Sequence, residues 1–292
     1  MLHTISKPAT TAILHQPHLR KANNRKLLLV LLIVACVLLV ATIVAGIFLS
    51  ESAMQTNFSQ KNLGPSLSHP FGTDWMGRDM FTRCIAGLST SILVGLLAAA
   101  TSALLAFLLA AVAALGPKKA DVFITWLIDL LMGIPHIILL ILISFAIGRG
   151  FWGITIGVAI THWPNLTRVI RAEILQCREA PFVACARRLG QSPLNIARKH
   201  MFPHVLPQFI TGLILLFPHA ILHEAALTFL GFGLPPEQPA IGIILSEAMG
   251  YLSAGMWWLA VFPGLALIIV VLLFDLLGSN LRKLIDPYRC QE

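Results

Sequence analysis

Two histidines and a glutamate stand at the end of a long uncharged run, in the segment PHAILHEAAL at residues 218–227. His219 and His223 are four residues apart, and a helix turns by about 400° over four residues, so both rings face the same side. Helical metal sites use this spacing, and imidazole suits nickel, copper and zinc. Glu224 points about 100° away from His223 and is a weaker candidate ligand. The pattern fits either a metal-binding pair or two rings that hydrogen-bond neighbouring helices.

The composition restricts the class of protein that surrounds these residues. The chain has 292 residues, of which 57% are hydrophobic and 12% charged, and its mean hydropathy is +0.82. A soluble domain of this length is not so apolar, so we expect an all-α membrane protein with several spans. Ionisable groups are costly in hydrocarbon, so those inside apolar runs are candidates for function. The five cysteines show neither a disulfide pattern nor zinc-site spacing.

Three more polar side chains interrupt apolar runs. Asp129 lies six residues before Pro135 and marks either a broken helix that lines a path or a buried hydrogen-bond anchor. His136 follows Pro135 and either contacts a substrate or caps a carbonyl that the proline frees. His162 precedes Trp163, and such a pair is also ordinary at a membrane interface. The candidate path residues are therefore Asp129, His136, His162, His219, His223 and Glu224.

The uncharged runs predict six transmembrane helices. The first follows a basic flank and is long enough to span a bilayer, as an uncleaved anchor is. The fourth has the shortest apolar stretch. The predicted helices cover residues 27–49, 84–117, 122–147, 151–163, 205–223 and 256–277. The predicted organisation is a tail (1–26), the first helix (27–49), an external segment (50–83), a five-helix core (84–278) that contains a cytoplasmic loop (164–204), and a second tail (279–292).

The distribution of basic residues predicts the orientation. Six spans place both termini on one side, and four of the 21 Lys and Arg fall on the other side. The remaining seventeen lie on the side of the termini, which the positive-inside rule assigns to the cytoplasm. The formal net charge of +8 is therefore a topology signal, and we do not expect a nucleic-acid partner.

Two hydrophilic segments need an explanation beyond connecting helices. Asp74, Arg78 and Asp79 lie in GTDWMGRD, which fits a metal site or, better, a tight turn with internal salt bridges. Residues 178–207 are long enough for two short helices separated by a turn. Gly190 is placed to end the first helix, and Ser192 and Pro193 are placed to begin the second. The first helix, about residues 180–189, is amphipathic with Phe182, Ala186 and Leu189 on one stripe, so it either docks into a groove of a soluble partner or lies on anionic lipid.

The second of these segments resembles the cytoplasmic coupling loop of ABC-importer permeases. The matching residues are Val183, Cys185, Ala186, Arg187, Leu189, Gly190, Ile196, His200 and Pro203. The chain departs from the family at Ala184, where the family has its name-giving glutamate. Residues 69–91, 225–248 and 281–288 are similar to segments of the peptide and nickel branch of these permeases, so the resemblance covers about residues 69–288.

The resemblance implies a type I importer permease in the bacterial cytoplasmic membrane. It implies a second homologous permease, two cytoplasmic ATPases that bind ATP and Mg²⁺, and an external solute-binding protein. This chain has no G-x-x-x-x-G-K-[ST] loop, so we expect it to be a transport subunit without a bound cofactor. The residues expected to couple to the ATPase are Phe182, Val183, Cys185, Ala186, Arg187, Leu189 and Gly190.

The substrate stays open between two classes. The spacing H-x-x-x-H at His219 and His223, and the pair His162-Trp163, are similar to nickel permeases of this branch. We therefore predict transport of nickel or a nickel-type metal chelate, with His219 and His223 as transient ligands. The alternative is a di- or oligopeptide. A transporter of another class, working without ATPase partners, is disfavoured because the sequence shows no inverted repeat.

Overall fold

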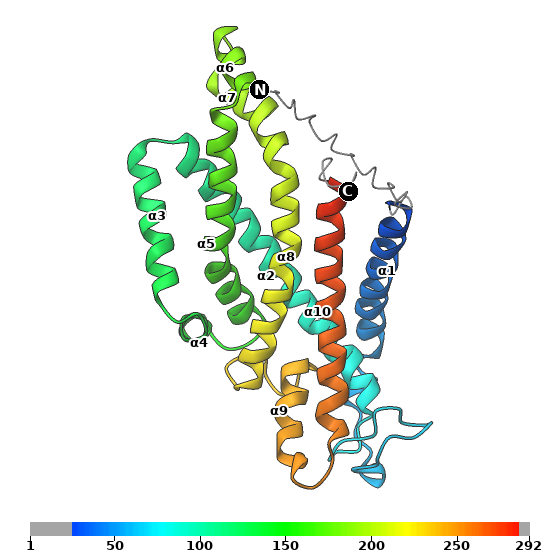
Figure 1. Cartoon of the computed structure of the whole chain (residues 1–292). Coiled ribbons are helices and arrows are strands. Elements are labelled where there is room, and N and C mark those ends of the chain that lie inside the picture. Colours follow the sequence, from blue (N-terminus) through cyan, green and yellow to red (C-terminus); the bar gives the residue numbers. More distant parts are fainter. Residues whose placement is uncertain (1–24, 286–292) are drawn as a thin grey trace, which may run out of the picture.

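Long helices run side by side through the molecule and alternate in direction (Figure 1). The computed structural model describes residues 25–285, so the predicted tails lie largely outside the described residues. The α-helices are α1 (Arg25–Leu49), α2 (Met80–Leu115), α3 (Lys118–Gly133), α4 (His136–Ile147), α5 (Phe151–Arg178), α6 (Pro181–Arg188), α7 (Pro193–Ile196), α8 (Phe202–Phe229), α9 (Ile241–Leu252) and α10 (Trp258–Ile285). A π-helical turn, Ala197–Met201, joins α7 to α8.

Four of these helical segments are long and apolar enough to cross a bilayer, and α3 with α4 makes a fifth if the bent pair counts as one span. The span predicted at residues 151–163 stays a prediction. It corresponds to α5, which continues through Pro164 to Arg178 instead of ending at residue 163. The predicted loop 164–204 therefore begins as helix. Its polar residues, which include Asn165 and Arg168, dilute the apolar stretch.

The helix predicted at residues 122–147 is broken. α3 and α4 meet at a bend of 100°, and α4 lies across the other helices (Figure 1). The break follows from Pro135, because a proline disfavours the α conformation of the preceding residue. Ile134 has φ −95° and ψ 136°, and Pro135 takes the N-cap position of α4. The bend places His136 on the inner end of α4, close to α5 and α8.

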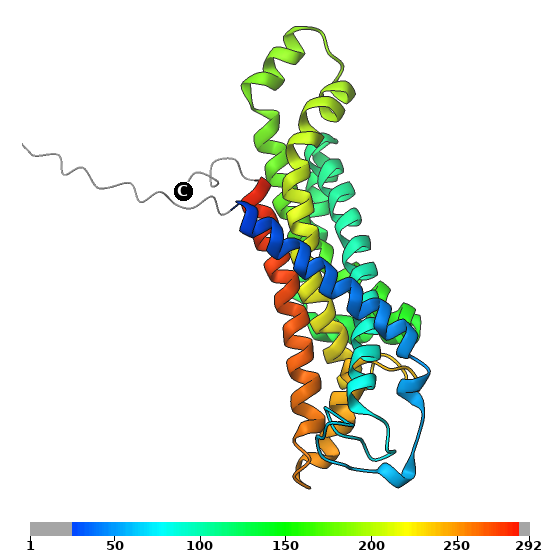
Figure 2. The ribbon, with the colours of Figure 1, turned by 90° about the vertical axis from the view of Figure 1, so that its right-hand side faces the viewer.

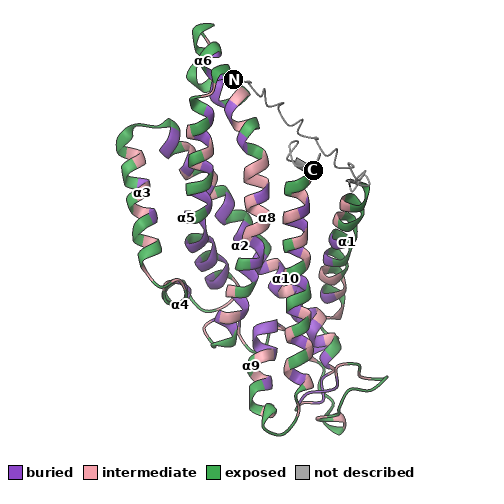
Figure 3. Ribbon diagram, in the orientation of Figure 1, coloured by how far each residue is buried: buried purple, intermediate pink, exposed green. Residues whose placement is uncertain are grey.

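The centre of the molecule is α2, which packs against α5, α1 and α8. Its buried face is rich in alanine, and small side chains let membrane helices approach closely. Ala98, Ala103, Ala106 and Ala110 are all fully buried. In contrast, α1 lies obliquely on the outside with most of its side chains exposed (Figures 2 and 3). The core therefore lies among α2, α5, α8 and α10.

A buried ion network closes one end of the bundle. Asp74 accepts hydrogen bonds from Arg78 Nε at 2.6 Å and from Arg83 Nη1 at 2.7 Å. Glu247 of α9 accepts a second bond from Arg83, at 2.8 Å. Asp79 caps α2 by accepting from the Thr82 backbone N–H at 2.9 Å. The prediction of a tight turn with internal salt bridges is confirmed, and the network also ties the predicted external segment to α9.

The other end carries the hairpin of α6 and α7, which projects beyond the bundle (Figure 1). The described ends of α1 and α10 lie at this end too, while residues 50–79 and α9 lie at the opposite end (Figure 1). This arrangement agrees with the prediction that the termini and the loop at residues 164–204 share one side and that residues 50–83 lie on the other. Which end faces the cytoplasm stays a prediction from the distribution of basic residues.

Candidate functional site

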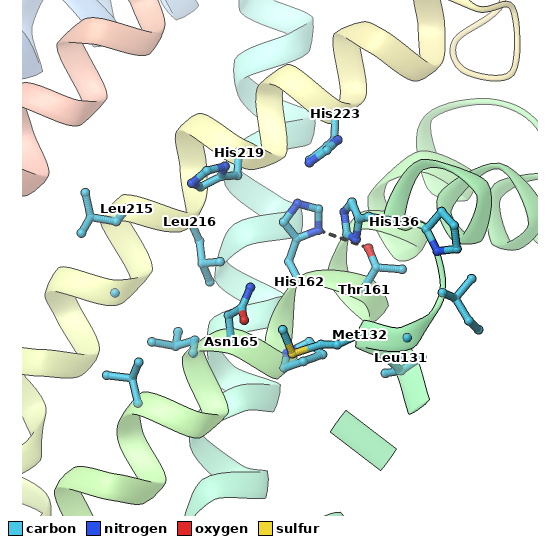
Figure 4. Close-up of a pocket in the computed structure, with 17 residues that line it drawn as sticks. Leu131, Met132, His136, Thr161, His162, Asn165, Leu215, Leu216, His219 and His223 are labelled. Atoms are coloured by element: carbon cyan, nitrogen blue, oxygen red, sulfur yellow. Dashed lines mark hydrogen bonds between the residues drawn. The ribbon is translucent and has the colours of Figure 1, made fainter. Parts of the chain in front are cut away.

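A cavity of about 740 Å³ opens between the α3–α4 break, α5 and α8 (Figure 4). Four histidines stand on its wall, together with Thr161, Asn165 and the apolar side chains of α3 and α8. The histidines are His136 at the start of α4, His162 of α5, and His219 and His223 of α8. The four predicted path histidines, from three separate helices, therefore meet at one place.

Three of the four histidines form a tight cluster. One ring nitrogen from each of His136, His162 and His223 lies within 4.8 Å of the others. The ring centroids are 4.7 Å apart for His136 and His162, 4.5 Å for His136 and His223, and 5.1 Å for His162 and His223. Figure 4 shows the three rings turned toward one another. The bend at Pro135 is what brings the first ring to the other two.

The hydrogen bond of His162 to the backbone fixes which of its ring nitrogens carries the proton. Its Nδ1 lies 2.9 Å from the carbonyl oxygen of Val158, and a carbonyl can only accept, so Nδ1 carries the proton. In the neutral ring the lone pair is then on Nε2. His162 Nε2 and His136 Nε2 are buried, and neither has a hydrogen-bond partner among the described residues. A neutral imidazole held in a fixed tautomer has a free lone pair of the kind that metal ions accept.

His219 lies one turn before His223 on α8 and also lines the cavity (Figure 4). The structure does not place it in the tight cluster, which holds His136 and His162 instead. The i,i+4 rule finds pairs within one helix only, so it found His219 and His223 but not the grouping across helices. Asn165 and Thr161 are further lining residues that the sequence did not single out.

Two predicted path residues lie away from the cavity. Glu224 is fully buried, and its Oε1 accepts from the Thr228 hydroxyl at 3.0 Å. Asp129 is exposed and forms an ion pair with Arg168 of α5. Neither side chain is among those that line the cavity. Asp129 thus ties α3 to α5 in this chain, but it is exposed, so the prediction that it is a buried anchor is wrong.

The helical hairpin of α6 and α7 has the predicted turn. Gly190 has φ +75°, which a glycine adopts without strain, and it follows the last turn of α6. The Ser192 hydroxyl accepts from the Asn195 backbone N–H at 3.3 Å, with Pro193 as the first residue of α7. The predictions for all three residues are confirmed.

The side chains of α6 divide differently from the predicted stripe. Val183 and Ala186 are buried against the bundle, whereas Phe182 and Leu189 are exposed. Leu194 of α7 is exposed as well. The stripe of Phe182, Ala186 and Leu189 therefore does not face one surface: Ala186 anchors the hairpin, and the larger apolar side chains remain available to a partner.

The fold and the projecting hairpin define a transport subunit, and comparison with known families shows which one. The chain belongs to the family described as binding-protein-dependent transport system inner membrane component, which matches residues 92–288. Members are multi-pass inner-membrane permease subunits of ABC importers. ATP is hydrolysed by separate ATPase subunits, and a solute-binding protein belongs to the system.

Individual relatives match most of the chain. A putative peptide transport system permease protein of Brucella suis biovar 1 (strain 1330) is 34% identical over 268 residues, which cover 92% of this chain and 90% of the relative. The dipeptide transport system permease protein DppC of Bacillus subtilis (strain 168) is 28% identical over 268 residues, covering 92% of this chain and 84% of DppC.

A solved structure supports the architecture. A chain of the MetNI methionine ABC transporter in an inward-facing conformation superimposes with a TM-score of 0.59 and 17% identity. The superposition covers 71% of this chain and 98% of that chain. At this identity the likeness shows the fold alone, which is the type I importer permease fold that the sequence predicted.

Proposed function

We propose that this chain is a permease subunit of an ATP-driven importer for di- or oligopeptides. This substrate class is supported by the names of the relatives of this chain. They include a putative peptide permease at 34% identity and the dipeptide permease DppC. The cavity of about 740 Å³ has room for a small solute, and its wall combines apolar side chains with neutral polar groups. A peptide needs both kinds of contact, because its backbone is polar and its side chains vary.

The proposed assembly pairs this chain with a second homologous permease. The cavity is bounded on this chain by α3, α4, α5 and α8, and the partner permease supplies the opposite wall. The exposed residues of the α6–α7 hairpin dock on a cytoplasmic ATPase, where ATP and Mg²⁺ bind. Closure of the two ATPases then moves the hairpin and switches access to the cavity from the solute-binding protein to the cytoplasm.

Uptake by the reconstituted complex tests this proposal. The complex of both permeases and both ATPases is placed in proteoliposomes with its solute-binding protein, and labelled dipeptides and longer peptides are offered. We expect uptake that requires ATP and that an unlabelled peptide inhibits. Binding-protein-dependent ATPase activity without peptide uptake would show that the assembly is right and the substrate class wrong.

A second candidate substrate is nickel or a nickel-type metal chelate, and the histidine-lined cavity favours it. A peptide path has no special need for four imidazoles, whereas imidazole is a good nickel ligand. Competition distinguishes the two candidates in the same proteoliposomes. If nickel enters and excess dipeptide leaves its uptake unchanged, the metal replaces the peptide as the substrate class.

A further inference from the structure

The tight cluster of His136, His162 and His223 has the composition of a transition-metal site. Its three donors are imidazoles from three different helices, and no carboxylate takes part. Glu224, the acid next to His223 in the sequence, accepts from Thr228 on its own helix and does not line the cavity. Hard cations such as Ca²⁺ and Mg²⁺ prefer oxygen ligands, so a cluster of nitrogen donors selects against them. Nickel, copper and zinc accept imidazole.

The burial of the cluster argues against a purely space-filling role. Packing alone would favour apolar side chains, since a buried polar atom without a partner destabilises the fold. Here the Nε2 atoms of His136 and His162 are both buried and have no hydrogen-bond partner in residues 25–285. His162 keeps its proton on Nδ1 through the bond to the Val158 carbonyl, so its remaining lone pair is directed away from α5's own backbone. A bound cation would satisfy these lone pairs.

We propose that His136, His162 and His223 bind one divalent first-row transition-metal ion on the wall of the cavity. Metal–nitrogen bonds of about 2.1 Å place tetrahedral ligand atoms roughly 3.4 Å apart. The ring nitrogens, which lie within 4.8 Å of one another, therefore draw together by at most about 1.4 Å on binding. Rotation of the side chains supplies a movement of this size.

The number of ligands suits transfer of the ion. Structural zinc sites use four protein ligands, whereas sites with three leave a position for water or for a donor atom of another molecule. Here that position opens into the cavity, where a chelating group that arrives with the metal can occupy it. Passage through a transport path also requires that binding be weak enough to permit release. His219, one turn away on the cavity wall, is the next imidazole that the ion can reach.

The inference rests on the metal-chelate candidate for its physiological role, but its test measures metal binding and not transport. The complete permease–ATPase complex is prepared in lipid nanodiscs with a tag that contains no histidine and without the solute-binding protein. Ni²⁺ is titrated by equilibrium dialysis, and Cu²⁺ is used as a spectroscopic probe whose electron paramagnetic resonance spectrum reports coordinating nitrogens.

The variants are His136→Gln, His162→Gln and His223→Gln, with His204→Ala as the matched control. Glutamine keeps a hydrogen-bonding side chain, and His204 is an exposed histidine on α8 outside the cluster. Loss of supporting groups around a metal costs roughly 10–100-fold in affinity, so loss of a direct ligand costs at least about tenfold. We expect each of the three variants to weaken Ni²⁺ binding by that factor and to change the nitrogen pattern of bound Cu²⁺. The His204→Ala complex should bind both ions as the wild type does.

Three outcomes would overturn the proposal. The first is wild-type Ni²⁺ affinity in all three variants. The second is loss of binding in a His219→Ala variant together with full binding in His136→Gln, which would assign the metal to the helical pair. The third is no saturable binding by the wild type. Basal ATPase activity of each variant verifies that the complex is intact, and peptide uptake by the same variants in proteoliposomes with the solute-binding protein judges the proposed substrate separately from this site.

Discussion

The exposed leucine at the tip of the hairpin provides a test of coupling. Leu189 is 80% exposed, and we expect Leu189→Asp to leave folding of this chain almost unchanged, within about 0.5 kcal/mol. If the ATPase covers this side chain, the substitution removes about 1.5–3 kcal/mol of apolar burial from the docked complex. That corresponds to a decrease of roughly 10- to 100-fold in the affinity of the ATPase for the permease.

The assay measures two quantities on membranes that contain equal amounts of permease: co-purification of the ATPase, and substrate uptake. Both should fall strongly in the Leu189→Asp variant. The control is Leu67→Asp, because Leu67 is also fully exposed but lies at the opposite end of the bundle. Wild-type co-purification together with full uptake in Leu189→Asp would refute the docking of this surface on the ATPase. The alternative, that α6 lies on anionic lipid, would then be favoured.

Three further substitutions test the turn, the topology and the break. Gly190→Pro should abolish transport while the protein remains in the membrane, because proline holds φ near −65° where Gly190 has +75°; uptake at the wild-type level would contradict this. A cysteine introduced at Gln191 should react with an impermeant reagent only after cells are opened, and labelling in intact cells would reverse the orientation. Pro135→Ala should let α3 and α4 straighten, so Cu²⁺ binding should weaken about as much as in His136→Gln; unchanged binding would show that the bend does not depend on the proline.

Local chemistry made the hairpin predictable. Gly190, Ser192 and Pro193 act on their own backbone, and the constraint that each imposes does not depend on the rest of the fold. The break near Pro135 was one of two alternatives at the sequence level, the other being a buried hydrogen-bond anchor at Asp129. The end of α5 was not predictable, because Pro164 stops a helix in an isolated peptide but is tolerated inside a bundle whose neighbours compensate for the lost hydrogen bond. The predicted boundary at residue 163 was therefore wrong.

The histidine cluster shows where sequence reasoning stops. All three members were candidates, yet their sequence positions are far apart, and only the packing of α4, α5 and α8 brings them together. The positions of the charged residues predicted the lining of the cavity less well than the histidines did. Asp129 and Glu224 were predicted to be path residues because they interrupt apolar runs. In the structure Asp129 forms an ion pair with Arg168, and Oε1 of Glu224 accepts from Thr228 while its Oε2 has no partner among the described residues; neither side chain lines the cavity. An ionisable group in an apolar run has either a structural or a functional role, and the groups that it contacts in the structure decide between the two.

The connection between the hairpin and the cavity follows from the chain order. The hairpin joins the end of α5 to the start of α8, and these two helices carry His162 and His223. From Arg178 to His162 the helix spans about 24 Å at 1.5 Å per residue, and helices transmit displacement over such a length without compressing. His136 lies on α4, a separate helix beyond the bend that packs against α5 but is not continuous with α5 or α8. A movement imposed on α6 and α7 therefore changes the position of two histidines relative to the third, so we expect docking of the ATPase to alter the spacing of the three imidazoles and, with it, their affinity for a metal.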